Sequence, residues 1–66
     1  MIKNRLLDIR LKAGYKKQKE FADFLGLAQN QYNRYENNNM QPSSEVLYRI
    51  SKKLGIPMES IIYEEE

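Results

Sequence analysis

The sequence predicts an all-α fold, a compact bundle of about five short helices. Apolar residues recur three and four positions apart in several short runs, which is the spacing that places them on one face of a helix. Glycines stand directly after three of these runs, at Gly14, Gly26 and Gly55, where a helix end in the left-handed conformation favours a residue without Cβ. Sixty-six residues suffice for one small domain, residues 1–66.

The first helix is expected from Ile2 to Ala13. Leu6, Ile9 and Ala13 lie at i, i+3 and i+7, and Gly14 is the predicted end of the run. Arg10 follows Ile9 and so lies beside the apolar stripe. Its stem is expected to pack down on the stripe.

The second and third helices are two amphipathic runs hinged at Gly26, in residues 18–37. Phe21, Ala22 and Leu25 form the narrow apolar stripe of the first run. In the second run, Tyr32, Tyr35 and Glu36 form the inner edge.

The last part of the chain contains a clear helix start at Ser43, followed by Leu47, Ile50 and Leu54 at helical spacing. Pro57 is suited to the first position of a final short helix. The tail, residues 61–63, is rich in residues that favour strands and could pair with residues 1–3 as short terminal strands. A frayed end is equally consistent with the sequence.

The outer face of the third helix carries amides and one arginine rather than the Glu and Lys usual on an exposed helix. Asn30, Arg34 and Asn37 form a row on this face. Amides and Arg make bidentate contacts with the edges of bases, Asn or Gln with adenine and Arg with guanine. The pattern therefore favours a DNA-recognition helix, while a polar, solvated surface helix is the simpler alternative. The candidate base-contacting residues are Gln29, Asn30, Gln31, Asn33 and Arg34.

The chain resembles the Cro and phage-repressor (XRE-type) helix-turn-helix family from Leu6 to about Ile61. The matching residues are Gln18, Phe21-Ala22-x-x-Leu25-Gly26, Tyr35-Glu36, Pro42-Ser43 and Lys53-Leu54-Gly55-Ile56-Pro57. The chain departs from the family pattern at Lys17 and Ala28, where a capping Ser or Thr is usual. The missing cap at Ala28 is expected to cost its helix about 1 kcal/mol. Tyr32 stands where the family usually has a β-branched residue, so its ring is expected to be partly buried, with its hydroxyl reaching water or a phosphate.

The resemblance implies further roles for named residues. Arg10 and Glu36 are expected to form a partly buried structural ion pair, and the loop after the third helix is expected to meet the DNA backbone. Gln18, at the first turn of the second helix, is expected to bind a phosphate through its amide and the free backbone N–H groups, with Lys16, Lys17 and Lys19 adding charge there. The lysines could also be ordinary solvated turn residues. The candidate phosphate-contacting residues are Lys16, Lys17, Gln18, Lys19, Asn37 and Asn39.

Charge and composition narrow the function further. The net charge is +2, but residues 1–20 contain seven basic and two acidic residues, whereas residues 55–66 contain four acidic residues and no basic one. A basic end is the electrostatic footprint of a phosphate-binding face. Without Cys or His the chain has no ligands for a structural zinc ion, and no metal or cofactor is expected. It also lacks a long apolar run, so we expect no signal peptide, no membrane span and a cytoplasmic location.

These observations predict a sequence-specific double-stranded DNA-binding regulator, and as a hypothesis a repressor. A homodimer formed through residues 54–63 would read a palindrome with two helices about 34 Å apart. An enzyme is not expected, because the chain has no candidates for acid–base or nucleophilic catalysis. It also has no room for a cavity of several hundred Å³, so no small-molecule ligand is expected. The alternative is an antitoxin-like or adaptor domain whose main role is to bind a partner protein.

Overall fold

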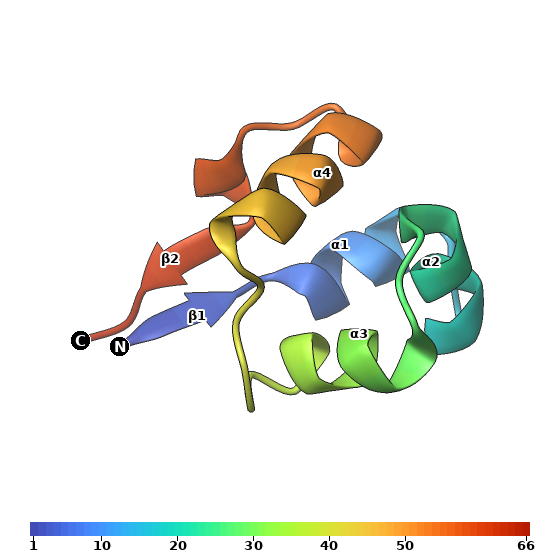
Figure 1. Cartoon of the computed structure of the whole chain (residues 1–66), viewed down its shortest axis with the longest axis horizontal. Coiled ribbons are helices and arrows are strands. Elements are labelled where there is room, and N and C mark those ends of the chain that lie inside the picture. The colour runs from blue at the N-terminus through green and yellow to red at the C-terminus, as the bar shows by residue number, and fades with distance from the viewer.

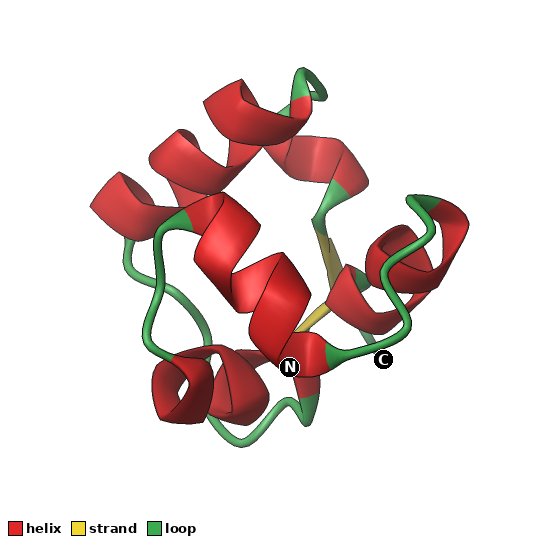
Figure 2. Ribbon diagram, turned by 90° about the vertical axis from the view of Figure 1, so that its right-hand side faces the viewer, coloured by secondary structure: helices red, strands yellow, loops and turns green.

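A computed structural model describes all 66 residues and consists mainly of helices, with one small sheet (Figure 1). The elements in chain order are β1 (Ile2–Asn4), α1 (Leu6–Lys12), α2 (Gln18–Leu25), α3 (Gln29–Glu36), α4 (Ser44–Leu54), the 3₁₀ turn η1 (Met58–Ser60) and β2 (Ile62–Glu64). Seen from the α2 side, the helices stand in front and the two strands lie behind them (Figure 2). The structure thus has four α-helices, and the expected fifth is a single 3₁₀ turn preceded by Pro57.

The N-terminal residues form a strand, so the predicted start of the first helix at Ile2 was wrong. β1 pairs antiparallel with β2, with Lys3 opposite Tyr63, and α1 begins only at Leu6. The predicted pairing of the two ends is confirmed, with both strands shifted by one residue toward the C-terminus. Local pattern could not fix this boundary, because the ladder that holds Ile2–Asn4 comes from the other end of the chain.

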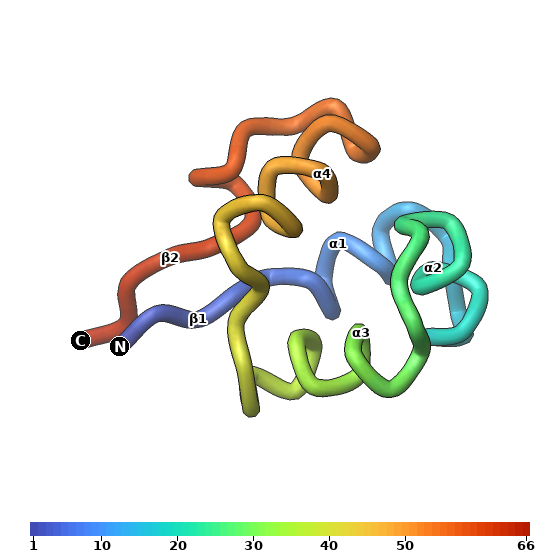
Figure 3. Tube along the Cα trace, in the orientation of Figure 1, coloured from blue at the N-terminus to red at the C-terminus, as the bar shows by residue number.

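The predicted helix ends at Gly26 and Gly55 are confirmed. Their φ angles of 75° and 71° lie in the left-handed region, where a side chain would strain the backbone. Ser43 caps α4, since its hydroxyl accepts a hydrogen bond from the Val46 N–H at 3.3 Å. The turn at Gly26 lets α2 and α3 pack against each other, as the trace in Figure 3 shows.

The core lies between the helices and is centred on aromatic rings. Phe21 and Tyr32 meet edge to face with centroids 5.6 Å apart, and both side chains are fully buried. The expectation that Tyr32 would reach water or phosphate was wrong, because its hydroxyl donates to Glu36 Oε1 at 2.7 Å inside the fold. The buried hydrophobic residues are Leu6, Phe21, Ala22, Tyr32, Tyr35, Leu47, Ile50 and Ile61.

The two ends of the chain lie together at the sheet, at the opposite end of the molecule from α2 (Figure 1). The molecule measures 30 × 23 × 22 Å along its principal axes. None of its helices has the length and apolar character needed to cross a membrane. The sheet and α2 therefore mark two ends, with α3 running between them.

Candidate nucleic-acid interface

The outer face of α3 is a polar surface without apolar side chains. Four of the five predicted base-contacting residues line one shallow hollow of about 560 Å³ on this face: Gln29, Asn30, Asn33 and Arg34. Asn30 and Arg34 are exposed, and Arg34 forms no ion pair within the protein. A guanidinium and amides on one exposed helical face can present donors and acceptors to another molecule.

The five predicted base-contacting residues differ in whether their side chains are already hydrogen-bonded within the protein. Asn33 is half-buried; its Nδ2 donates to Gln18 Oε1 at 2.7 Å, and its Oδ1 accepts from Asn37 Nδ2 at 3.1 Å. Gln31 lies outside the hollow, and its amide donates to the Tyr35 hydroxyl at 2.7 Å. The side chains of Gln29 and Arg34 make no hydrogen bond within the protein, so they are the most available of the five.

Beneath this face, Arg10 and Glu36 form a buried ion pair that joins α1 to the end of α3. Arg10 Nε lies 2.7 Å from Glu36 Oε1, and the two side chains are 9% and 3% exposed. Glu36 also accepts hydrogen bonds from the Tyr32 hydroxyl and the Gln18 amide. No buried side-chain N or O atom lacks a hydrogen-bond partner, so the charges of the pair are fully compensated.

The ionisation of this cluster is set by burial and by its hydrogen bonds. Burial by itself would raise the pKa of the Glu36 carboxyl, but hydrogen bonds from Arg10, Gln18 and Tyr32 outweigh it and hold the pKa below its usual value. Burial, together with the hydrogen bond to Glu36, raises the pKa of the Tyr32 phenol. The hydrogen bond to Glu36 raises the pKa of Arg10. The cluster therefore consists of a carboxylate, a guanidinium and a neutral phenol at neutral pH.

The same arginine holds the basic turn in place. Arg10 Nη1 donates to the Tyr15 and Lys16 carbonyls at 3.0 and 2.7 Å, which fixes residues 15–16 beside α3. Lys16, Lys17 and Lys19 are exposed, and only Lys19 has an acidic neighbour, a surface pair with Asp23 at 3.4 Å. The turn is thus a cluster of exposed cations whose backbone Arg10 ties to the Glu36 end of α3.

Gln18 opens α2 with its side chain turned inward. Its amide donates to Glu36 and accepts from Asn33, so it connects the start of α2 to α3. Lys17, at the N-cap position, makes no side-chain cap. The first backbone N–H groups of α2, including that of Gln18, consequently have no capping side chain. Because the Gln18 amide is used inside the fold, these N–H groups are better placed than the amide to bind a phosphate.

The loop after α3 closes the helix with a left-handed asparagine. Asn38 has φ 60°, its N–H donates to the Tyr35 carbonyl at 2.9 Å, and the Asn39 N–H donates to the Arg34 carbonyl at 3.0 Å. This is the Schellman pattern, with Asn in place of the usual Gly. Asn37 and Asn39, the residues directly before and after it, are exposed. Turn chemistry in this Asn run is thereby confirmed for Asn38.

One residue of this region was missed by the sequence patterns. Asn4 is 6% exposed, and its side chain bonds the end of α3 and the loop that follows. The first helix was predicted to begin at Ile2, so Asn4 was placed inside a helix, where nothing in the pattern indicated contacts with α3. Its Oδ1 accepts from the Leu6 N–H two residues on, as in an Asx turn, and the tendency of Asn to form such turns is a signal that could have found it.

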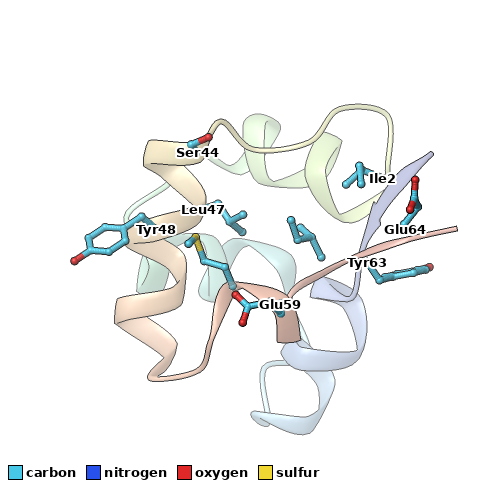
Figure 4. A pocket seen from close by; sticks show the side chains of 9 residues that line it. Ile2, Ser44, Leu47, Tyr48, Glu59, Tyr63 and Glu64 are labelled. Carbon is cyan, nitrogen blue, oxygen red and sulfur yellow. The ribbon is translucent and has the colours of Figure 1, made fainter.

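A second surface lies away from α3, between α4 and the sheet. An open, mainly apolar groove of about 660 Å³ runs there, with Leu47 and Tyr48 of α4 on one side and Ile2 and Tyr63 of the strands on the other (Figure 4). The expectation that the fold leaves no room for a hollow of several hundred Å³ was therefore wrong. The remaining lining residues are Ser44, Met58, Glu59, Ile62 and Glu64.

Comparison with known protein families gives a match to the helix-turn-helix family HTH_3 over residues 6–61. The matched region begins with the first residue of α1 and ends directly before β2, so it contains all four α-helices. Both strands of the sheet lie outside it. Comparison with the curated proteins gives no match.

Proposed function

We propose that this chain, which belongs to the XRE-type helix-turn-helix family of DNA-binding domains, is a sequence-specific transcriptional repressor that acts as a homodimer on a palindromic operator. Membership of this family supports the more general part of the proposal, that the chain is a DNA-binding regulatory domain. The observation that supports the finer one is the outer face of α3, where Arg34 and neighbouring amides are exposed above a fully bonded buried cluster.

In this mechanism α3 enters the major groove and its outer face reads the bases. Arg34 donates two hydrogen bonds to a guanine, and Gln29 or Asn30 pairs with an adenine edge. Asn33 lies on this face and Gln31 flanks it. To contact a base directly, Asn33 must give up or share its hydrogen bond to Gln18, and Gln31 its hydrogen bond to Tyr35. Their contribution to base recognition is therefore smaller than that of Arg34.

Contacts to the DNA backbone flank the recognition helix. Lys16, Lys17 and Lys19 supply positive charge, and the first N–H groups of α2, at Gln18, bind a phosphate at the positive end of the helix. Asn37 and Asn39 contact the backbone at the other end of α3. The Arg10–Glu36 pair contacts no DNA in this scheme and holds both flanks at fixed positions relative to α3.

The dimer surface in this proposal is the apolar groove, which includes part of the C-terminal segment 54–63. Ile2, Tyr48 and Met58, which line the groove, are 46%, 53% and 36% exposed. Exposed apolar side chains that lie together are typical of surfaces that bind another protein. To read a palindrome, two copies joined at this end must present their recognition helices about one helical turn, roughly 34 Å, apart. Repression then follows from occupying a promoter.

The groove equally favours a second function, that of an antitoxin-like or adaptor domain. In that case a partner protein, rather than a second copy, covers Tyr48 and its neighbours, and DNA reading is secondary. Such a protein tolerates Arg34→Ala and Asn30→Ala in its biological role, because neither residue lies near the groove.

Selection of bound duplexes from a random pool tests the proposal directly. We would use about 150 mM salt, where non-specific binding to phosphates is weak. The proposal expects a palindromic motif that is no longer recovered with Arg34→Ala. A folded protein that recovers no motif would refute base reading and favour the protein-binding function.

A further inference from the structure

Asn4 is the only residue of the sheet whose side chain forms hydrogen bonds with α3 and the loop that follows it. Its Nδ2 donates to the Tyr35 carbonyl at 2.6 Å and to Gln41 Oε1 at 2.8 Å. Its Oδ1 accepts from the Leu6 N–H at 3.0 Å. One buried amide thus bonds the last turn of α3, the loop after it and the first turn of α1.

Asn38 and Gln41 complete this connection from the loop side. Asn38 Oδ1 accepts from the backbone N–H of Asn4 and from Gln41 Nε2, both at 2.9 Å. Asn38 also holds the left-handed position that ends α3. The loop residues 38–41 are therefore bonded to β1 by both the backbone and the side chain of Asn4.

We expect the connection to be stiff, because every buried polar group in it has a hydrogen-bond partner. Both N–H groups and the oxygen of the Asn4 side chain are used, and moving the loop away from β1 would leave them buried without partners. β1 also contributes Ile2 to the apolar groove. A single strand therefore borders the groove at one end and fixes the end of the recognition helix at the other.

We propose that Asn4 is a positioning residue that fixes α3 and the Asn37–Asn39 loop relative to the groove, so that the dimer surface and the DNA-reading helix move as one body. This inference rests on the proposed function. Its consequence is that the distance between the two recognition helices of a dimer is set by the protein. Binding should therefore depend sharply on the number of base pairs between the half-sites.

The test uses variants of the loop rather than of Asn4, whose loss would also remove the acceptor of the Leu6 N–H at the start of α1. Asn38→Gly keeps the left-handed backbone and removes the acceptor, and Gln41→Ala removes the partner of the Asn4 amide. Ser43→Ala is the matched control, because it deletes one capping hydrogen bond at the nearby start of α4 without touching β1.

Two measurements are made on the double variant Asn38→Gly/Gln41→Ala. Amide hydrogen exchange at Asn39 and Met40 should accelerate by about tenfold or more, while exchange in the β1–β2 ladder stays as in the wild type. The preference for the natural half-site spacing over spacings one base pair longer or shorter should fall by a similar factor. Ser43→Ala should change neither quantity.

The inference is overturned if loop exchange in the double variant matches the wild type, or if its spacing preference is unchanged. A preference that falls in Ser43→Ala as well would also overturn it, because general destabilisation would then be the cause. If the wild-type protein binds no duplex, the proposed function fails. Loop exchange then still decides whether Asn4 holds the loop to the sheet.

Discussion

Arg34 is the exposed cation at the centre of the outer face of α3, free of any ion pair. We expect Arg34→Ala to cost about 1–3 kcal/mol on the selected operator, because a bidentate contact to guanine is lost, and to relax the preference at one base position. Titration of the operator and of its single-base variants measures both effects.

Arg49→Ala is the control for this prediction. Arg49 is an exposed arginine on α4 that pairs only with Glu45 in its own helix, so its loss should leave DNA affinity nearly unchanged. Equal losses for the two variants would show that Arg34 acts only through its charge.

Glu36 links folding to pH. Its pKa is lowered in the folded state, so the unfolded chain binds a proton more readily than the folded one as the pH falls. The stabilisation is complete above the unfolded value of about 4.3 and is lost as the pH falls through the lower folded value. Titration of the Glu36 carboxyl by NMR should give a midpoint below that of an ordinary glutamate.

The variant Glu36→Gln provides the complementary measurement. It leaves Arg10 buried without a charged partner, a loss on the order of 3–5 kcal/mol for a dry pair, and it should remove this part of the acid dependence. Urea unfolding at pH 7 and pH 4 measures both. A variant as stable as the wild type at neutral pH would contradict the structural role given to the pair.

Among the elements, the basic turn before α2 is expected to attract DNA without reading it. Lys17 is exposed and has no ion pair, so Lys17→Ala should weaken binding to all sequences about equally. The slope of log K against log salt should fall by about one for each copy bound. A changed sequence preference would show that the division between phosphate and base contacts is wrong. Lys53→Ala, at an exposed position on α4 that lines neither the groove nor the outer face of α3, serves as the matched control.

The start of α3 is under-capped. Ala28 occupies the N-cap with an extended backbone, ψ 143°, and no side-chain hydrogen bond. Ala28→Ser should therefore stabilise the chain by about 1 kcal/mol, which raises Tm by about 4–8 °C at this size. Thermal unfolding measures the change. Ala13→Ser, at the C-terminal end of α1, offers no N–H to cap and should give no such rise.

At the scale of the whole molecule, the groove should decide whether two copies associate. Met58→Glu adds a charge among apolar lining residues and next to the carboxylate of Glu59, so it should dissociate the proposed dimer and weaken binding to the palindrome far more than to a half-site. Sedimentation and titration of both duplexes measure this. Leu11→Glu, a comparable change at a 54% exposed position on α1 outside the groove, should leave the dimer intact.

The sequence by itself determined the all-α class, the hinge at Gly26 and the residues on the outer face of α3. These features depend on helical periodicity and on the conformational freedom of glycine, which act within a few residues of one another. The resemblance to the helix-turn-helix family, shown by the match over residues 6–61, depends on the same local spacing. It also placed Arg10 against Glu36, which the structure sets 2.7 Å apart.

Only the tertiary structure decided what depends on contacts between distant parts of the chain. The strand at Ile2–Asn4 exists because β2 comes back to pair with it, and Asn4 is important because the end of α3 lies within hydrogen-bond distance of it. Gln18 turns inward for the same reason, since Glu36 at the end of α3 accepts a hydrogen bond from its amide. Sequence periodicity shows which face of a helix is apolar, but hydrogen bonds between distant segments depend on how the helices and strands are arranged in space.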